Sequence, residues 1–185
     1  MENQKSFEFY GYYDVENLKK ILTEKNLNWD EFTGRQRACT DMKNTKTIPI
    51  VYDKNFFQTN FTPIFTENYE LFKQELDKIS EIILQKTEGK GYLLRAIMVK
   101  LLAHKNIPKH KDVANKTFEV SKRIHIPIIT NSECIFTVGE ESLHMKEGEI
   151  WEMNNDKLEH FVENNGDEDR VHLILDWCEK NPHDL

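Results

Sequence analysis

The sequence lacks several features that would assign it to a special class of proteins. No apolar run approaches the roughly 20 residues that a membrane-spanning helix needs. The first residues, MENQKSFEFYGYYD, lack the basic and then apolar pattern of a secretory signal peptide. The chain also has no internal repeat, low-complexity tract or linker. We therefore expect a single domain over residues 1–185, in the cytoplasm and with no membrane partner.

Cysteine is also scarce, and acidic residues outnumber basic ones. The three cysteines lie far apart, at Cys39, Cys134 and Cys178, and are expected to be free thiols rather than a disulfide framework or a zinc site. The 32 acidic residues outnumber the 25 lysines and arginines, giving a formal charge of −7. Duplex nucleic-acid binders normally carry a basic face, so that partner is not expected. With 38% apolar residues the composition is that of a globular protein. The sequence leaves the oligomeric state open.

Two helices are expected in the N-terminal half. Asp14 can cap a helix that continues to about residue 25. Thr66 can cap a longer one over 67–87, whose apolar residues recur at three- and four-residue steps along a single face. That face is expected to cover one side of a sheet. The polar stretch 28–45 between the helices is expected to be irregular.

Strands dominate the rest of the chain. The run 92–103 is apolar enough for either a strand or a buried helix, and its pattern alone does not decide between them. The segments after it are short, alternate in polarity and are separated by turn residues, which favours an all-β barrel or sandwich. The expected strands are 7–13, 47–52, 92–103, 121–128, 133–138, 158–162 and 170–177, and the segment 143–151 is expected to include a turn at Glu147-Gly148.

Alternation along two of these strands places polar side chains on one face. Arg123 and His125 oppose a row of isoleucines, and Arg170 and His172 oppose Val171 and Leu173. One interpretation is a sheet with a single solvent-facing side. The other is a polar barrel interior. The same residue types on more than one strand favour the interior.

A set of spaced residues suggests what such an interior holds. His110 and Asp112 form a His-x-Asp triplet, a second histidine follows 50 positions later at His160, and Arg170 comes ten residues after that. Two imidazoles and a carboxylate on one face of a metal are the ligands of non-haem Fe(II) oxygenases. A nearby guanidinium suits a bidentate carboxylate of a co-substrate.

The surrounding residues make a longer pattern, which covers roughly residues 92–178. Its pieces are IPKHKD at 107–112, RIHIP at 123–127, MKEGEIW at 145–151, the pair Asn154-Asn155, His160 with Val162 and Asn165, and DRVHL at 169–173. In this combination the C-terminal half resembles the aspartyl/asparaginyl β-hydroxylase family, which includes prokaryotic proline 3-hydroxylases.

The resemblance implies a mainly β fold: a double-stranded β-helix (jelly-roll or cupin-like) core at 92–178, with helices packed on one face and residues 1–90 as a supporting region. It implies an Fe(II)- and 2-oxoglutarate-dependent dioxygenase that uses O₂ to hydroxylate an unactivated C–H bond. By similarity, iron is bound by His110, Asp112 and His160. Arg170 holds the distal carboxylate of 2-oxoglutarate, and Arg123 and His125 lie near its metal-proximal carboxylate.

One departure separates this chain from the animal members of the family. Those members have glycine at the position of Asp112, whereas this chain keeps the complete triad, as the proline hydroxylases do. Halogenation needs that coordination position free for a halide, so the carboxylate argues against it.

Two other functions remain open from the sequence. One is a cupin-type metal enzyme that does not use 2-oxoglutarate, and the other is a non-catalytic sensor that binds a small carboxylate. For a hydroxylase, the resemblance points to an amino acid or an amino-acid-containing small molecule. A small substrate is favoured because the chain ends soon after its last strand. Arg35, Arg37 and Asp41 are the nearest candidates to bind its charged groups, although each could be an ordinary surface charge.

Overall fold

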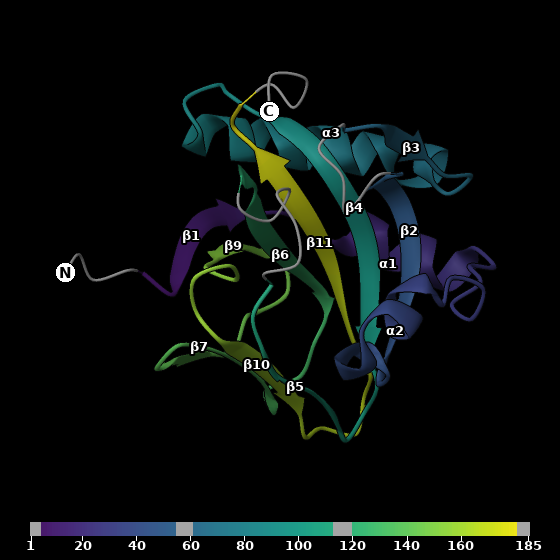
Figure 1. Ribbon diagram of the computed structural model, residues 1–185. Helices are drawn as coiled ribbons and strands as arrows, with labels where there is room; N and C mark the ends of the chain where they lie inside the picture. Colours follow the sequence, from purple (N-terminus) through teal and green to yellow (C-terminus); the bar gives the residue numbers. More distant parts are fainter. Residues whose placement is uncertain (1–4, 55–60, 113–119, 181–185) are drawn as a thin grey trace.

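The computed structural model describes residues 5–54, 61–112 and 120–180, which form two antiparallel sheets and the helices around them (Figure 1). The larger sheet has the strand order β1-β9-β6-β11-β4-β2-β3, and the smaller one β5-β10-β7-β8. From β4 to β11 the chain passes repeatedly between the two sheets, which makes the predicted double-stranded β-helix. The strands are β1 (Phe7–Tyr12), β2 (Thr45–Asp53), β3 (Pro63–Phe65), β4 (Tyr92–Leu101), β5 (Lys105–His110), β6 (Lys122–Ile129), β7 (Cys134–Val138), β8 (Glu141–Leu143), β9 (Glu149–Met153), β10 (His160–Asn164) and β11 (Arg170–Cys178).

Helices α1 (Glu16–Glu24) and α3 (Tyr69–Lys86) cover the outer face of the larger sheet. In this layer Leu18 and Phe72 pack with the isoleucine row of β6, and all of these side chains are fully buried. Each fully buried residue of this size contributes roughly 1.5–3 kcal/mol by leaving water, so the layer stabilises the sheet that carries Arg123, His125 and Arg170. The prediction of helices on one face of the sheet is confirmed.

Both helices begin a little later than the sequence predicts. Asp14 Oδ1 accepts a hydrogen bond from the Glu16 amide at 3.0 Å, and Thr66 Oγ1 accepts one from the Asn68 amide at 3.2 Å. The two predicted caps therefore close turns that precede the helices and do not cap them. The helix-capping residues are Val15 and Asn68, neither with a side-chain cap.

The stretch 28–45 is less irregular than predicted. It contains the short helix α2 (Gly34–Ala38), which lies beside β2 (Figure 1), and the 3₁₀ turn η1 (Thr40–Met42), which contacts α2 and β5. A five-residue helix is too short to show an apolar period, so its pattern cannot be recognised in the sequence. Within β2, the pairing with β4 shifts register between Pro49 and Val51, an irregularity suited to a residue without an amide hydrogen.

The run 92–103 forms a strand, β4, which pairs with β11 along its whole length. The faces predicted from alternation are also confirmed, and the polar face lies inside. Arg123, His125, Arg170 and His172 are all buried, with exposed fractions of 1–7%. The alternative in which these residues contact solvent is therefore wrong. Among the described residues, no helix has both the length and the hydropathy for a membrane crossing.

Candidate active site

The two histidines of the predicted triad meet across one pair of strands. His110, the last residue of β5, is the ladder partner of His160, the first residue of β10, and their ring centroids lie 4.2 Å apart. The register of this pair shifts between His160 and Val162, opposite the stretch of β5 that contains Pro108. Residues 50 positions apart thus become neighbours through strand pairing.

Asp112 lies two residues beyond the end of β5, and a turn from elsewhere in the chain holds it. Its amide donates to the Asn155 carbonyl at 3.0 Å, and Asn155 Nδ2 donates to Asp112 Oδ2 at 2.9 Å. This places Asp112 Oδ1 3.7 Å from His110 Nε2. One donor atom from each of His110, Asp112 and His160 lies within 4.8 Å of the others, as one metal ion requires.

Hydrogen bonds and burial favour the neutral form of both histidines, with the proton on Nδ1. His110 Nδ1 lies 2.7 Å from the Pro108 carbonyl, and His160 Nδ1 lies 3.5 Å from the Leu158 carbonyl. A proton on each Nδ1 leaves Nε2 as the free donor atom. Burial lowers the pKa of His110, and burial together with the nearby His110 lowers the pKa of His160 to about 3. Both rings are therefore neutral at pH 7, the form that binds metals.

A buried charge network adjoins Asp112. Arg123 forms an ion pair with Asp112 Oδ2, and its Nε donates to Asp176 Oδ1 at 2.9 Å. The other oxygen of Asp176 lies 2.7 Å from Arg95 Nε. Asp176 is completely buried, and its pKa is lowered by Arg123 and Arg95, which are its partners on β6 and β4. Arg123 therefore links a candidate metal ligand to the core of the sheet.

Arg170 lies deeper in the same interior, with only 1% of its surface exposed. Its guanidinium carbon is 5.7 Å from the centroid of the Phe136 ring, and the thiol of Cys134 is a nearby hydrogen-bonding group. Its Nε and Nη1 have no hydrogen-bond partner, and no carboxylate of the described residues forms an ion pair with it. Burial lowers the pKa of Arg170. Burying an unpaired cation costs free energy, so Arg170 is a candidate to bind an anion.

His125 and His172 line the space beside Arg170. Their Nδ1 atoms lie 3.2 Å apart, and His125 Nε2 is buried without a partner. Burial lowers the pKa of both rings well below the usual value, and Arg170 lowers both further. His160 also lowers the pKa of His125, so His125 is an electrostatic neighbour of both the triad and Arg170.

A cavity of about 480 Å³ opens beside the triad. Its polar wall includes His110, Asp112, Arg123, Arg95 and Arg35. The rest of the wall comes largely from α2, η1, β2 and β4, with the residues Phe32, Gly34, Cys39, Asp41, Met42, Thr47, Pro49, Tyr52, Asp53, Ile97 and Lys111. A volume of this size suits a small molecule.

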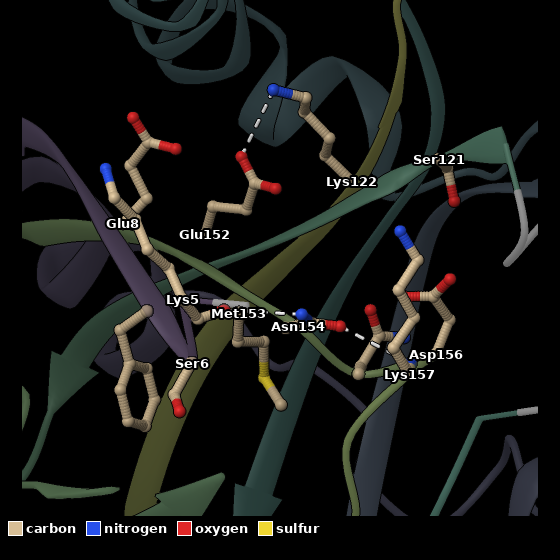
Figure 2. A pocket seen from close by; sticks show the side chains of 12 residues that line it. Lys5, Ser6, Glu8, Ser121, Lys122, Glu152, Met153, Asn154, Asp156 and Lys157 are labelled. Carbon is tan, nitrogen blue, oxygen red and sulfur yellow. Dashed lines mark hydrogen bonds and ion pairs between the residues drawn. The ribbon is translucent and has the colours of Figure 1, made fainter. Parts of the chain in front are cut away.

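The turn that holds Asp112 is fixed from its other side. Asn154 Nδ2 donates to the Lys5 carbonyl and Asn154 Oδ1 accepts from the Lys157 amide, both at 3.3 Å (Figure 2). The turn also borders a second, smaller hollow of about 130 Å³ between β1 and β9. Lys122 at this hollow is paired with Glu152 at 3.3 Å, and the hollow contains none of the predicted site residues.

The structure therefore brings together all six residues that the sequence predicts for the site. Of the three suggested substrate-binding residues, Arg35 and Asp41 line the cavity, whereas Arg37 is exposed and does not. Sequence reasoning placed Asn155 in the family pattern without a role, and it missed the roles of Arg95 and Asp176. The period-2 pattern of β11 could have revealed Asp176, because residues 170, 172, 174 and 176 share the inward face. Arg95 was visible as a charge that interrupts an apolar run.

The fold is that of known oxygenases. An oxidoreductase of the 2OG-Fe(II) oxygenase family from Burkholderia pseudomallei is 12% identical and superposes with a TM-score of 0.69, over 95% of this chain and 85% of the other. A viral collagen prolyl hydroxylase from Paramecium bursaria Chlorella virus-1, in its 2OG complex, is 9% identical with a TM-score of 0.61, over 97% and 98%. A Pseudomonas putida prolyl-4-hydroxylase is 9% identical with a TM-score of 0.55, over 95% and 94%. At these identities the similarity establishes the fold.

The family is established by the sequence itself. No curated protein matches this chain significantly. The model of the aspartyl/asparaginyl β-hydroxylase family, however, matches residues 17–180, which is nearly the whole chain and extends well beyond the C-terminal half. The chain therefore belongs to the aspartyl/asparaginyl β-hydroxylase family of Fe(II)- and 2-oxoglutarate-dependent oxygenases, as its sequence predicts.

Proposed function

We propose that this enzyme hydroxylates an unactivated C–H bond of an amino acid or of an amino-acid-containing small molecule. His110, Asp112 and His160 bind Fe(II), and Arg170 binds the distal carboxylate of 2-oxoglutarate. Arg123 and His125 lie next to its metal-proximal end. The observation that carries the proposal is that the converging donor atoms and an unpaired buried guanidinium occupy one interior.

The residues present fit the metal. Two neutral imidazoles and one carboxylate converge on a common point, and the donor set is of the type that binds non-haem iron facially. Hydrogen bonds fix each member: the two histidines through backbone carbonyls, and Asp112 through Asn155 and Arg123. Such supporting contacts normally determine how well a ligand set binds its metal.

The residues also fit the co-substrate. Arg170 offers Nε and Nη1 without partners, and its flat guanidinium matches a carboxylate in a bidentate pair. His125 adds a buried ring nitrogen, Nε2, which also lacks a partner. A dicarboxylate ligand would neutralise the cation that the empty protein leaves uncompensated.

Iron, 2-oxoglutarate and O₂ supply the oxidising chemistry, in which 2-oxoglutarate is decarboxylated to succinate and the substrate gains one oxygen atom. The protein contributes position and environment. Asn155 and Arg123 fix the direction of the Asp112 carboxylate, while Phe136 and the buried strands keep water away from Arg170. Phe32, Met42 and Ile97 place apolar groups in the cavity beside the triad, where the substrate is held for reaction.

The cavity supports the choice of a small substrate. Its volume of about 480 Å³ has room for an amino acid, and its wall carries both a cation, Arg35, and an anion, Asp41. Opposite charges on one wall suit a zwitterion. We place the enzyme in the cytoplasm, where its free cysteines stay reduced.

The test is an aerobic assay for succinate from 2-oxoglutarate, with and without Fe(II), together with free amino acids scored by the gain of one oxygen in mass. Succinate that requires both Fe(II) and 2-oxoglutarate is the expected result. Substrate turnover with iron but without 2-oxoglutarate would show a cupin-type enzyme instead. Binding of 2-oxoglutarate without any turnover would show a sensor.

A further inference from the structure

Arg35 is a second cation of the site, and no direct counterion for it lies within residues 5–54, 61–112 and 120–180. It lies in α2, on the wall of the cavity beside the triad, and its Nη1 is shielded from solvent without a hydrogen-bond partner. Among the described residues, no carboxylate forms an ion pair with it. The cavity therefore contains a guanidinium whose charge is not paired by the part of the chain that the structure describes.

The acidic groups nearby are already engaged. Asp176 Oδ1 accepts a hydrogen bond from Arg123, and Asp176 Oδ2 forms an ion pair with Arg95. Asp112 is held by Arg123 and Asn155, and Asp53 Oδ1 accepts from the Thr62 amide at 2.8 Å. Asp41 Oδ2 accepts a hydrogen bond from the Cys39 thiol at 3.8 Å.

The surrounding charges add to this imbalance. Burial and, after it, the positive charges of Arg95, Arg123 and Arg170 together lower the pKa of Arg35 to about 9, although the negative charge of Asp176 opposes them. An uncompensated cation of this kind destabilises the empty protein, so its presence needs another reason.

We propose that Arg35 binds a free carboxylate of the substrate and so restricts the enzyme to small free acids. This inference rests on the proposed function. A planar guanidinium pairs with a carboxylate through two parallel hydrogen bonds, and a single uncompensated positive charge matches a monoanion. The apolar cavity wall, with Phe32, Met42 and Ile97, accommodates the body of such a molecule. An aminoacyl thioester on a carrier, or a residue inside a peptide backbone, has no α-carboxylate and is excluded unless its side chain supplies one.

The first test compares matched pairs of substrates. The panel contains the free amino acids and their carboxamides, each scored for the gain of one oxygen in mass and for succinate release with Fe(II) and 2-oxoglutarate. The expected result is turnover of one or more acids, with their carboxamides slower by about 10- to 100-fold, the usual effect of losing a charged hydrogen-bond pair. A carboxamide without any other carboxylate that reacts as fast as its acid overturns the inference. Succinate release without turnover of any free acid also overturns it.

The second test uses two arginines of the same helix. Arg35→Met removes the cavity cation, whereas Arg37→Met removes an exposed arginine two residues away that does not line the cavity. Arg35→Met should raise the KM for the acid about 10- to 100-fold, a far larger change than in the KM for 2-oxoglutarate, and should reduce the preference for acid over carboxamide. Arg37→Met should leave both values unchanged. Equal effects of the two variants contradict the proposal.

A stability measurement separates substrate binding from a structural role. Because Arg35 is uncompensated, its replacement should raise the melting temperature of the metal-free, substrate-free protein, by about 2–4 °C for each kcal/mol gained. A structural arginine would give a lower melting temperature, and that result overturns the inference. This measurement needs no turnover. If no succinate forms under any condition, the proposed function fails. The role of Arg35 is still decided by the melting temperatures, measured without ligand and with the free amino acids of the panel added.

Discussion

Asn155 holds Asp112 by two hydrogen bonds, one from its side-chain amide to Oδ2 at 2.9 Å and one at its carbonyl oxygen from the Asp112 amide at 3.0 Å. The two residues are 43 positions apart in the sequence. Asp112 lies beyond the end of β5, where no strand pairing among the described residues fixes the backbone. The two hydrogen bonds to Asn155 fix its position instead. The position of the carboxylate ligand therefore depends on the turn after β9.

Replacing Asn155 with alanine should weaken metal binding about 10- to 100-fold, the usual effect of removing a group that orients a metal ligand. The measurement is a titration of the metal-free protein with Ni(II), which binds to such sites more tightly than Fe(II) does. Asn154→Ala is the matched control, since its side chain braces the same turn without contacting Asp112. Equal losses in both variants would mean that the turn as a whole, and not the Asn155 contact, matters.

Replacing His110 or His160 with alanine should abolish stabilisation by metal. At a free Ni(II) concentration 100-fold above the dissociation constant, the wild type should gain about 2.7 kcal/mol in the free energy of unfolding. Urea unfolding with Ni(II) and with a chelator measures this gain. His104→Ala is the control, because His104 is exposed and paired only with Asp167, at 3.0 Å. A histidine variant that keeps the full gain would show that the metal binds elsewhere.

Replacing Arg170 with methionine should raise the KM for 2-oxoglutarate by about 10- to 100-fold, because a desolvated charged pair is lost. Arg170→Lys keeps the charge without the bidentate geometry and should fall between the methionine variant and the wild type. Metal content should stay near the wild-type value in both. An unchanged KM would place the carboxylate clamp on another residue.

Stability should fall as the pH drops below about 6.5. His172 and His125 are neutral in the fold because burial lowers the pKa of both rings, whereas unfolding returns that pKa to its ordinary value of 6.5. Below that pH the unfolded chain binds more protons, so each ring should reduce the free energy of unfolding by up to about 1.4 kcal/mol per pH unit. Above it their contribution should be constant. Urea unfolding at pH 7.5, 6.5 and 5.5 measures the slope.

His172→Gln is the variant that tests the cause of this pH dependence. It should remove the share of the slope that comes from one ring, because glutamine does not titrate. If the free energy of unfolding falls with pH equally steeply in the variant and the wild type, groups other than His172 cause the pH dependence.

The sequence was sufficient for those parts of the site that follow from local periodicity. Alternation in β6 and β11 placed Arg123, His125 and Arg170 on the inward face, and the structure confirms it. The spacing from His110 to His160 and on to Arg170 was likewise recognisable without knowledge of which strands pair. The fold followed because short alternating strands and a long amphipathic helix are each read from a few neighbouring residues.

The other parts depend on contacts that no local pattern encodes. That Asp176 lies between Arg95 and Arg123 follows only when β11 is known to pair with β4 on one side and β6 on the other. The Asn155–Asp112 contact joins a turn to a loop, neither of which has a period. Arg35 could be proposed but not distinguished from Arg37, because a five-residue helix gives no indication of which side faces the cavity.

Because His110 and His160 lie on paired strands, a metal that needs both of them can bind only when β5 and β10 pair in the correct register. The two imidazoles face each other across one rung of the β5–β10 ladder, and a slip of one residue would turn one of them to the opposite side of the sheet. A chain with mispaired strands therefore cannot form the triad, so an ion bound there as proposed would stabilise only the correctly paired state. Iron supply to such an enzyme would then affect the yield of correctly folded molecules as well as their activity.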